Sequence, residues 1–254
     1  MKLSVIVPVY NEENSIAETL LSLNNVLRRE NIEHEIVVVD DNSKDSTMKV
    51  LKNHQQFINT LRIESNKGPN GFGYAVRYGL ERFSGDCAAI MMADMSDDPE
   101  DLVKFYRKMV TENVDCVFGS RWIRGGKVYD YPLLKRILNR IFNTVVRIMF
   151  RLKYNDFTNA FKLYKKETIS GLKPLISPHF NLTLELPLKA VVRGYSYAIL
   201  PNSWRNRKYG ESKLRIKEMG SRYVFILLYC LIEKFFSKGD FKKINDIIIK
   251  NNPG

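Results

Sequence analysis

Short apolar runs alternate with segments of helical spacing along the first half of this 254-residue chain. The runs are rich in β-branched residues and cover residues 3–9, 35–39, 61–63, 87–92 and 115–118. After the first run, Ile16, Leu20, Leu23 and Leu27 recur three or four positions apart, which indicates one face of a helix. Strands that alternate with helices predict βαβ units around a mostly parallel sheet. Such a sheet is covered on both faces, which explains why the runs are apolar throughout.

Polar or ionisable residues follow four of the predicted strands. These groups are residues 10–12, 40–43, 93–94 and 119–121. In open α/β sheets, ligands bind at the edge formed by the carboxyl ends of the strands. We therefore expect the four groups to converge on one rim and to form a binding site rather than four separate turns.

The segment MMADMSDDPE, residues 91–100, ends an apolar run in Asp94, Asp97 and Asp98. Carboxylates at a strand end suit a hard cation such as Mg²⁺ or Mn²⁺, which prefers oxygen ligands. The position two before Asp94 is Met92, so a paired acid is missing there. Two interpretations stay open: a metal site with a depleted ligand set, or an acidic turn in which Asp98 caps the next helix.

The net charge of +12 favours an anionic partner: a nucleic acid, a nucleotide or an acidic membrane. Basic residues concentrate in residues 121–154 and 205–218, whereas the first hundred residues are more balanced. Because the positive charge is concentrated late in the chain, we expect it to form a specific basic surface rather than to be spread over the whole protein.

The cysteines and the hydropathy of the chain indicate the cellular compartment in which it works. Cys87, Cys116 and Cys230 form neither a zinc pattern nor a disulfide framework, which favours a reducing compartment. The start of the chain does not resemble a signal peptide, because its apolar run is short. The longest apolar run, residues 223–232, is about half of the roughly 20 residues that span a bilayer. We expect a cytoplasmic protein without a transmembrane helix.

A long helical pattern runs from Pro132 to about residue 153, with aliphatic residues on one stripe and arginines on another. The arginines are Arg136, Arg140, Arg147 and Arg151. We favour an interfacial helix that places aliphatic side chains among lipid tails and arginines at headgroups. The alternative is a helix whose apolar face packs against another helix or a second subunit. A further helix is predicted over residues 182–192, where we assign its single acid, Glu185, to solubility.

Five segments, VIVPVYNEE, EIVVVDDNSKDST, NKGPNGFGYAVRYGL, MMADMSDDPEDL and FGSRW, resemble the inverting family 2 glycosyltransferases in their order. Two later segments, DFTNAFKLYKKE and RNRKYGESKL, resemble the polyprenyl-phosphate or dolichyl-phosphate mannose and glucose synthases of that family. The resemblance covers residues 2–215, and the combination of DDNSKDST with R-x-x-G-E-S-K is specific.

The resemblance implies an α/β GT-A fold: a Rossmann-like, mostly parallel sheet flanked by helices, with C-terminal amphipathic interfacial helices. It divides the chain into three parts. Residues 1–125 would bind the nucleotide sugar, and residues 126–217 would bind the acceptor through the amphipathic helix and a basic closing loop. Residues 218–254 would form a helical appendage.

The resemblance also implies which residues bind the nucleotide sugar. They are Pro8, Tyr10, Glu12, Val39, Asp41, Met92, Ala93, Asp94, Arg121, Arg207 and Lys213. Four of them, Asp94, Arg121, Arg207 and Lys213, are assigned to catalysis. A bound cation, arginine and lysine can stabilise the charge that grows on a leaving diphosphate. Arg207 and Lys213 would lie in a loop that closes over the diphosphate.

A divalent cation, Mg²⁺ or Mn²⁺, is implied by the family pattern Asp-x-Asp-x-Gln, which corresponds here to Met92, Asp94 and Ser96. We assign the cation to Asp94, Ser96 and Asp97. Asp97 or water would then replace the ligand that is missing at Met92.

The implied reaction moves a hexose from a GDP- or UDP-linked donor to a polyprenyl phosphate at the cytoplasmic membrane face, by inverting direct displacement. A phosphate acceptor is already an anion and needs no general base. This fits a chain in which none of the three histidines, His34, His54 and His179, stands beside a predicted strand end. The alternatives are a soluble family 2 enzyme for a saccharide or protein acceptor, and a basic nucleic-acid-binding protein. The second alternative lacks a helix-turn-helix, RNP or zinc signature, so we expect no nucleic-acid partner.

Overall fold

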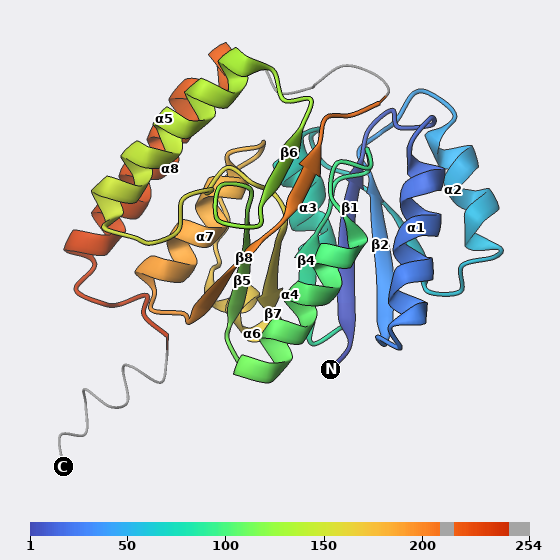
Figure 1. Cartoon of the computed structure of the whole chain (residues 1–254), viewed down its shortest axis with the longest axis horizontal. Coiled ribbons are helices and arrows are strands. Elements are labelled where there is room, and N and C mark those ends of the chain that lie inside the picture. The colour runs from blue at the N-terminus through green and yellow to red at the C-terminus, as the bar shows by residue number, and fades with distance from the viewer. Residues whose placement is uncertain (209–215, 244–254) are drawn as a thin grey trace.

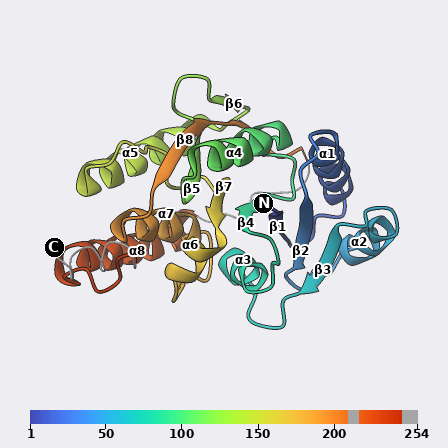
Figure 2. The same cartoon turned by 90° about the horizontal axis from the view of Figure 1, so that it is seen from below.

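Residues 1–208 and 216–243 are described by the computed structural model of the chain, with side chains for 1–208 and 220–243. The described residues form a seven-stranded sheet with helices on both faces (Figures 1 and 2). The strands are β1 (Leu3–Val9), β2 (His34–Asp40), β3 (Leu61–Ser65), β4 (Cys87–Ile90), β5 (Cys116–Ser120), β6 (Lys127–Tyr129), β7 (Lys162–Lys165), β8 (Tyr197–Pro201) and β9 (Ser203–Arg205). The helices are α1 (Ile16–Arg29), α2 (Thr47–Gln55), α3 (Phe72–Leu80), α4 (Pro99–Glu112), α5 (Leu133–Phe150), α6 (Lys166–Gly171), α7 (Leu182–Val192) and α8 (Ile216–Phe236).

The sheet has the strand order β3-β2-β1-β4-β7-β5-β8. Neighbouring strands run parallel except at β7, which is antiparallel to both β4 and β5. The prediction of a mostly parallel α/β sheet is confirmed. The insertion of β7 between β4 and β5 was not predicted, because hydrophobic patterning carries no information about strand direction.

Both faces of the sheet are buried, as the continuous apolar runs predicted. In β1, Val5 and Val7 pack against the face covered by α1, α2 and α4. Ile6 points the other way, into the core shared with α3, α7 and α8. Figure 2 shows α3, α7 and α8 on the opposite side of the sheet from α1 and α4.

A second, two-stranded sheet pairs β6 with β9 in parallel. It lies above the carboxyl ends of the main strands in Figure 1. An isolated bridge joins Trp204 of β9 to Asp97, and the backbone N–H of Arg205 donates to the carbonyl of Ser96 (3.0 Å). The segment that leads to residue 208 is therefore fastened to the acidic turn before α4.

α5 and α8 lie at the end of the molecule farthest from α2 (Figure 1). Their contacts include the rings of Phe142 and Tyr223, which meet edge to face at 5.4 Å, and a hydrogen bond from Lys234 to the carbonyl of Phe150 at 2.9 Å. The long helix predicted from Pro132 is confirmed, although it ends at Phe150 rather than near residue 153. Neither helix, nor any other in the described part of the chain, has the length and hydropathy required to cross a bilayer.

Candidate active site

The strand ends converge on one cavity of about 1140 Å³, as the sequence predicted. Its wall includes most of the residues assigned from the sequence: Pro8, Tyr10, Glu12, Asp41, Met92, Asp94, Ser96, Asp97, Arg121 and Arg207. Val39 and Ala93 are buried beside it and do not line it. Lys213 falls outside the described residues, so its role stays a prediction.

At one end of the cavity, Asp41 is held by the glycine-containing loop before α3. One carboxylate oxygen of Asp41 accepts a hydrogen bond from the Asn66 side chain, and the other accepts from the backbone N–H of Gly71, both at 2.7 Å. A Cβ atom at Gly71 would lie 2.6 Å from the carbonyl oxygen of Pro178, so this position requires glycine. The loop therefore fixes the direction in which Asp41 faces the cavity.

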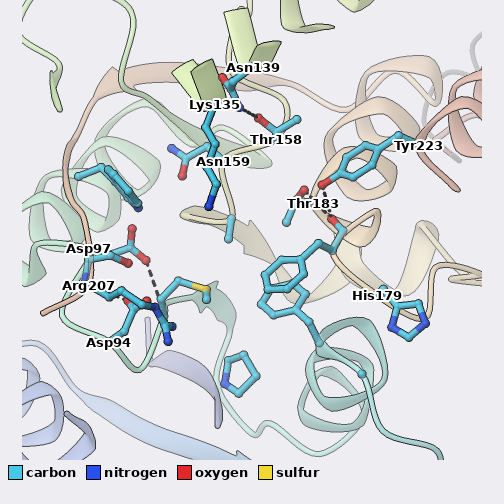
Figure 3. A pocket seen from close by; sticks show the side chains of 18 of the residues that line it. Asp94, Asp97, Lys135, Asn139, Thr158, Asn159, His179, Thr183, Arg207 and Tyr223 are labelled. Carbon is cyan, nitrogen blue, oxygen red and sulfur yellow. Dashed lines mark hydrogen bonds and ion pairs between the residues drawn. The ribbon is translucent and has the colours of Figure 1, made fainter. Parts of the chain in front are cut away.

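Arg207 bridges two acids of the strand rim. Its Nη2 atom lies 2.7 Å from Asp94 Oδ2, beside which Figure 3 shows it, and 3.2 Å from Glu12 Oε1. Burial opposes the charge on the guanidinium, but Asp94 and Glu12 outweigh it and raise the pKa of Arg207 above its ordinary value. Arg207 is thus already docked on the rim. The closure predicted for the loop that carries Arg207 and Lys213 stays a prediction, because residues 209–213 lie outside the described part of the chain.

The acidic turn separates its carboxylates into two environments. Asp94 faces the cavity, with one oxygen on Arg207 and the other accepting from the backbone N–H of Ser96 at 3.1 Å. Asp97 also lines the cavity, but it is more deeply buried and accepts from the backbone N–H of Met92 at 3.0 Å. Burial, assisted by the nearby charge of Asp94, raises the pKa of Asp97 to about 7. Asp97 therefore carries a proton more readily than an ordinary carboxylate does.

The remaining acids of this turn have structural roles. Asp98 caps α4 by accepting from the backbone N–H of Glu100 at 3.0 Å, as the second interpretation of the turn predicted. Asp101 accepts from the backbone N–H of Ser203 at 2.6 Å and so anchors β9. The interpretation of Asp98 as a helix cap is thus confirmed, whereas the metal site at Asp94 stays a prediction.

A divalent cation fits the residues on this rim. Among the described residues, no three acidic, histidine or cysteine side chains are arranged to enclose a metal ion alone. Mg²⁺ at nucleotide sites commonly takes one or two carboxylates and completes its shell with phosphate oxygens and water. Asp94, with Asp97 beside it on the same turn, is a donor set of that kind.

Arg121 is paired with a residue that sequence reasoning did not assign. Its Nε and Nη2 atoms donate to the two carboxylate oxygens of Asp156, at 2.8 and 2.7 Å, and both side chains are buried. Burial opposes the charge, yet Asp156 raises the pKa of Arg121 further above its ordinary value. The guanidinium lies 5.6 to 5.9 Å from the rings of Trp122, Tyr131 and Trp204. Arg121 is thus fixed in an aromatic wall of the cavity.

The other end of the cavity is built by α5, α8 and the loop before β7. α5 supplies Lys135 and Asn139, and the Asn139 side chain donates to the hydroxyl of Thr158 at 2.7 Å. Lys135 points into the cavity (Figure 3) and has no hydrogen-bond or ion-pair partner within the described ranges. No motif marked these residues, because α5 reads as a membrane or packing helix from its periodicity alone.

Two further cavity residues were missed for the same reason. His179 reaches the cavity from the loop before α7, although it follows no strand. Tyr223 lines it from α8 and donates to the carbonyl of Phe180 at 3.1 Å. A search confined to strand ends cannot find either residue.

The assignment of Glu185 to helix solubility is wrong. Glu185 is fully buried, pairs with Lys189 at 2.6 Å and accepts from the backbone N–H groups of Ile176 and Ser177. It ties the preceding loop to α7. A single acid in a helical sequence looks solvent-exposed unless its basic partner four positions later is recognised as buried with it.

The outer surfaces of α5 and α8 carry exposed apolar side chains. They are Leu133, Leu134, Ile137, Leu138, Ile141, Val145 and Ile148 in α5, and Val224, Phe225, Leu228, Ile232, Phe235 and Phe236 in α8. The alternative in which this stripe of α5 packs against another helix of the chain does not hold for the described residues. Arg136 and Arg140 lie 5.4 and 5.2 Å from the ring of Trp122, and Arg151 stands just past the helix end.

Comparison with known proteins identifies the class of enzyme to which this fold and rim correspond. Residues 4–172 match the model of glycosyl transferase family 2, and the chain belongs to that family. The resemblance found in the sequence motifs is thereby confirmed.

Two curated relatives are polyprenyl-phosphate enzymes by name. The chain is 31% identical over 221 residues to the dolichol-phosphate mannosyltransferase of Pyrococcus furiosus, which covers 85% of this chain and 60% of that protein. It is 28% identical over 220 residues to the undecaprenyl-phosphate mannosyltransferase of Micrococcus luteus, which covers 84% of this chain and 88% of that protein. The chain thus spans about 60% of the length of the Pyrococcus relative.

Solved structures confirm the GT-A fold. Glucosyl-3-phosphoglycerate synthase from Mycobacterium tuberculosis, in complex with Mn²⁺, UDP and phosphoglyceric acid, superposes with a TM-score of 0.69. The two sequences are 18% identical, and the match covers 91% of this chain and 78% of that chain. At this identity the likeness establishes the arrangement of strands and helices.

Proposed function

We propose that this family 2 enzyme transfers a hexose from a GDP- or UDP-linked donor to a polyprenyl phosphate, while lying on the cytoplasmic face of a membrane. The observation that carries the proposal is the continuity of the cavity. It runs from the acidic strand rim, where Asp41 and Asp94 lie, to Phe142 and Tyr223 where α5 meets α8. A polar donor and an apolar acceptor could therefore meet inside one space. The names of the two curated relatives support the same acceptor class.

The distribution of charge along the cavity supports a phosphate acceptor. The described acids that line it, Glu12, Asp41, Asp94 and Asp97, all belong to the strand rim. The part built by α5, α7 and α8 contributes Lys135 and Arg222 and no carboxylate among its described lining residues. A hydroxyl acceptor would need a base to remove its proton, whereas a phosphate arrives as an anion and needs a cation.

The residues assigned to the donor divide the work on the nucleotide sugar. Pro8, Tyr10, Glu12 and Asp41 would bind the base and ribose. Asp94 would hold a divalent cation at the diphosphate. Arg207, now on Asp94 and Glu12, would turn to the diphosphate oxygens when the donor binds, with Lys213 assigned beside it. The cation, when bound, supplies positive charge to the leaving diphosphate.

The reaction would be a single displacement. An oxygen of the acceptor phosphate attacks the anomeric carbon on the face opposite the leaving group. The bond from that carbon to the diphosphate oxygen breaks, its electron pair leaves with the nucleoside diphosphate, and the anomeric configuration inverts. Lys135 would hold the acceptor phosphate, because it points into the cavity without a partner of its own among the described residues.

Membrane contact would come from the exposed stripes of α5 and α8. The prenyl chain of the acceptor cannot leave a bilayer without exposing apolar surface to water, at roughly 25 cal/mol per Å². An enzyme for such an acceptor must therefore reach the membrane surface. Basic residues near an anionic leaflet add about 1 kcal/mol each, and Arg147 and Arg151 are exposed at this end of the molecule.

The test is a transfer assay with labelled GDP-mannose, GDP-glucose, UDP-glucose and UDP-galactose. Each donor is incubated with Mg²⁺ or Mn²⁺ and either undecaprenyl phosphate in anionic vesicles or a mixture of water-soluble saccharides and 3-phosphoglycerate. We expect label to enter the organic phase with one donor. Label that enters only water-soluble products would overturn the lipid acceptor and favour a soluble family 2 enzyme.

A further inference from the structure

A lysine is buried beneath the end of the cavity assigned to the acceptor. Lys162 lies in β7 and is 1% exposed, yet none of the described carboxylates lies within ion-pairing distance of its ammonium. A buried charge without a partner is costly, and proteins normally pair or neutralise it. Lys189, the other fully buried lysine among the residues whose side chains are described, follows that rule and pairs with Glu185.

The ammonium of Lys162 donates to backbone carbonyls and lies 5.8 Å from the centre of the Tyr154 ring. It donates to the carbonyl oxygens of Phe157 (3.0 Å), Asn159 and Thr183 (3.3 Å). Asn159 and Thr183 both line the cavity, the first from the loop before β7 and the second from the start of α7. One buried cation thus joins two separate segments of the cavity wall.

The same loop carries other contacts of the acceptor end. Its Asp156 fixes Arg121, and its Thr158 accepts hydrogen bonds from Asn139 and Asn143 of α5, at 2.7 and 3.1 Å. The position of this short loop therefore sets the positions of Arg121 and α5 on the two sides of the cavity. Lys162 stabilises the loop by donating hydrogen bonds to its carbonyl groups at Phe157 and Asn159.

The charges around Lys162 leave its ammonium without a dedicated counter-ion. Burial lowers the pKa of Lys162 to about 7, and the charge of Asp156 acts in the opposite direction. Asp156 itself is engaged by Arg121 through two hydrogen bonds. Arg121 lowers the pKa of Lys162 and Asp97 raises it, both more weakly. An anion held in the cavity above would supply the missing negative charge.

We infer that Lys162 is a positioning residue for the anionic acceptor: its ammonium holds Asn159 and Thr183 at the cavity wall and places positive charge behind them. The inference rests on the proposed function, because it assigns the phosphate to this end of the cavity. Lys162 does not touch the substrate. It acts through the two carbonyl-bearing segments and through its field, which is strong in a medium of low dielectric constant.

The experiment compares Lys162→Met, Lys162→Gln and Lys162→Arg with the wild-type enzyme, using farnesyl phosphate as the acceptor. For Lys162→Met we expect the KM for farnesyl phosphate to rise about tenfold or more, because the variant removes both the positive charge behind the acceptor site and the tie between the two wall segments. The KM for the nucleotide sugar should change less than about twofold, because the donor rim lies at the other end of the cavity. Lys162→Arg keeps the charge and should recover part of the acceptor affinity.

Lys189→Met is the matched control, because it also removes a buried lysine, one that pairs with Glu185 and is not among the residues that line the cavity. It should lower the melting temperature and leave both KM values near those of the wild type. Lys162→Gln retains hydrogen-bond donors and serves if the methionine variant does not fold.

Two results would overturn the inference. If the acceptor KM of a folded Lys162→Met or Lys162→Gln enzyme is unchanged, or rises in proportion to the donor KM, Lys162 is a fold-stabilising residue only, and the proposed function still stands. If the wild-type enzyme transfers no sugar to farnesyl or undecaprenyl phosphate, the proposed function falls and the inference falls with it.

Discussion

The two ends of the cavity differ in whether their charged side chains have partners within the protein. At the strand rim, Asp41, Asp94 and Glu12 already hold hydrogen bonds or ion pairs with the protein. At the other end, Lys135 has no partner among the described residues, and the helices beside it expose apolar side chains to solvent. The polar groups of the rim are thus engaged by one another, whereas the helical end has an unpaired cation and exposed apolar side chains among the described residues.

This difference follows from how the two ends are positioned. The rim residues stand at the ends of adjacent parallel strands, which are held in register by the sheet and by packed helices on both faces. The helical end depends on contacts between α5, α8 and one loop, and it faces outward. A rigid rim suits the proposed nucleotide sugar, which must bind in one orientation. An open apolar end suits the long prenyl chain of the proposed acceptor. The predictions below run from the largest expected effect to the smallest.

The largest effect is expected at the rim. Asp94→Asn should lower transfer by about 10³ or more, because it removes the carboxylate proposed for the cation and the partner of Arg207. The measurement is the initial rate of label transfer with excess Mg²⁺ or Mn²⁺. Asp98→Ala on the same turn is the control. It should cost about 1 kcal/mol of stability through loss of the α4 cap, with transfer close to that of the wild type.

Arg207→Ala should lower turnover by about 10², if its contact strengthens on the diphosphate as the bond breaks. Calorimetry should also show a changed affinity for Mn²⁺ without nucleotide, since Asp94 loses its internal ion pair. Arg205, two positions earlier, stacks on Tyr129 and faces solvent, so Arg205→Ala serves as the control. Equal losses for the two variants would show that only general positive charge matters.

At the helical end, replacing Ile141 and Ile148 of α5 with serine should weaken binding to anionic vesicles by about tenfold, because two exposed apolar side chains no longer enter the bilayer. Folding stability should change by less than about 0.5 kcal/mol, since both side chains face solvent. Phe57→Ser, at an exposed position 76% accessible in another region, is the control and should float like the wild type. Wild-type protein that stays at the bottom of the gradient at low salt would contradict the membrane role.

The smallest effect is expected for Glu35, whose carboxylate stabilises the half of the protein assigned to the donor. Burial alone would raise the pKa of Glu35, but hydrogen bonds from Ser84, Ser4 and Arg62 lower it to about 2. Because the pKa is lower in the folded state, the carboxylate stabilises the fold at pH values above the ordinary glutamate pKa. This stabilisation is lost as the pH falls toward 2. Glu35→Gln should therefore cost on the order of 2 kcal/mol near pH 7, and its deficit should shrink between about pH 5 and pH 3. Urea unfolding across that range measures it, and a deficit independent of pH would contradict the assignment.

The alternation of apolar runs and amphipathic segments was sufficient to predict the sheet and the rim. Local patterning decides which segments become strands, and parallel strands must end at a common edge. The residues after those strands, from Tyr10 to Arg121, therefore came together as expected. The direction of β7 and the pairing of β6 with β9 could not be predicted, because both depend on contacts between distant segments.

The helical end shows the limit of periodicity. It predicted α5 and its apolar stripe, but not that Lys135 and Asn139 turn into the cavity while neighbouring residues face outward. It also made Glu185 look solvent-exposed, although the side chain is buried beside Lys189.

The sequence by itself determined the family, the strand order along the chain and the acids at the rim, since these depend on motifs and local periodicity. Only the tertiary structure decided that Asp97 is buried, that Asp156 holds Arg121 and that Lys162 lies without a carboxylate partner beneath the cavity. The reason is physical: burial and charge pairing are properties of groups brought together from distant parts of the chain, and no local pattern specifies them.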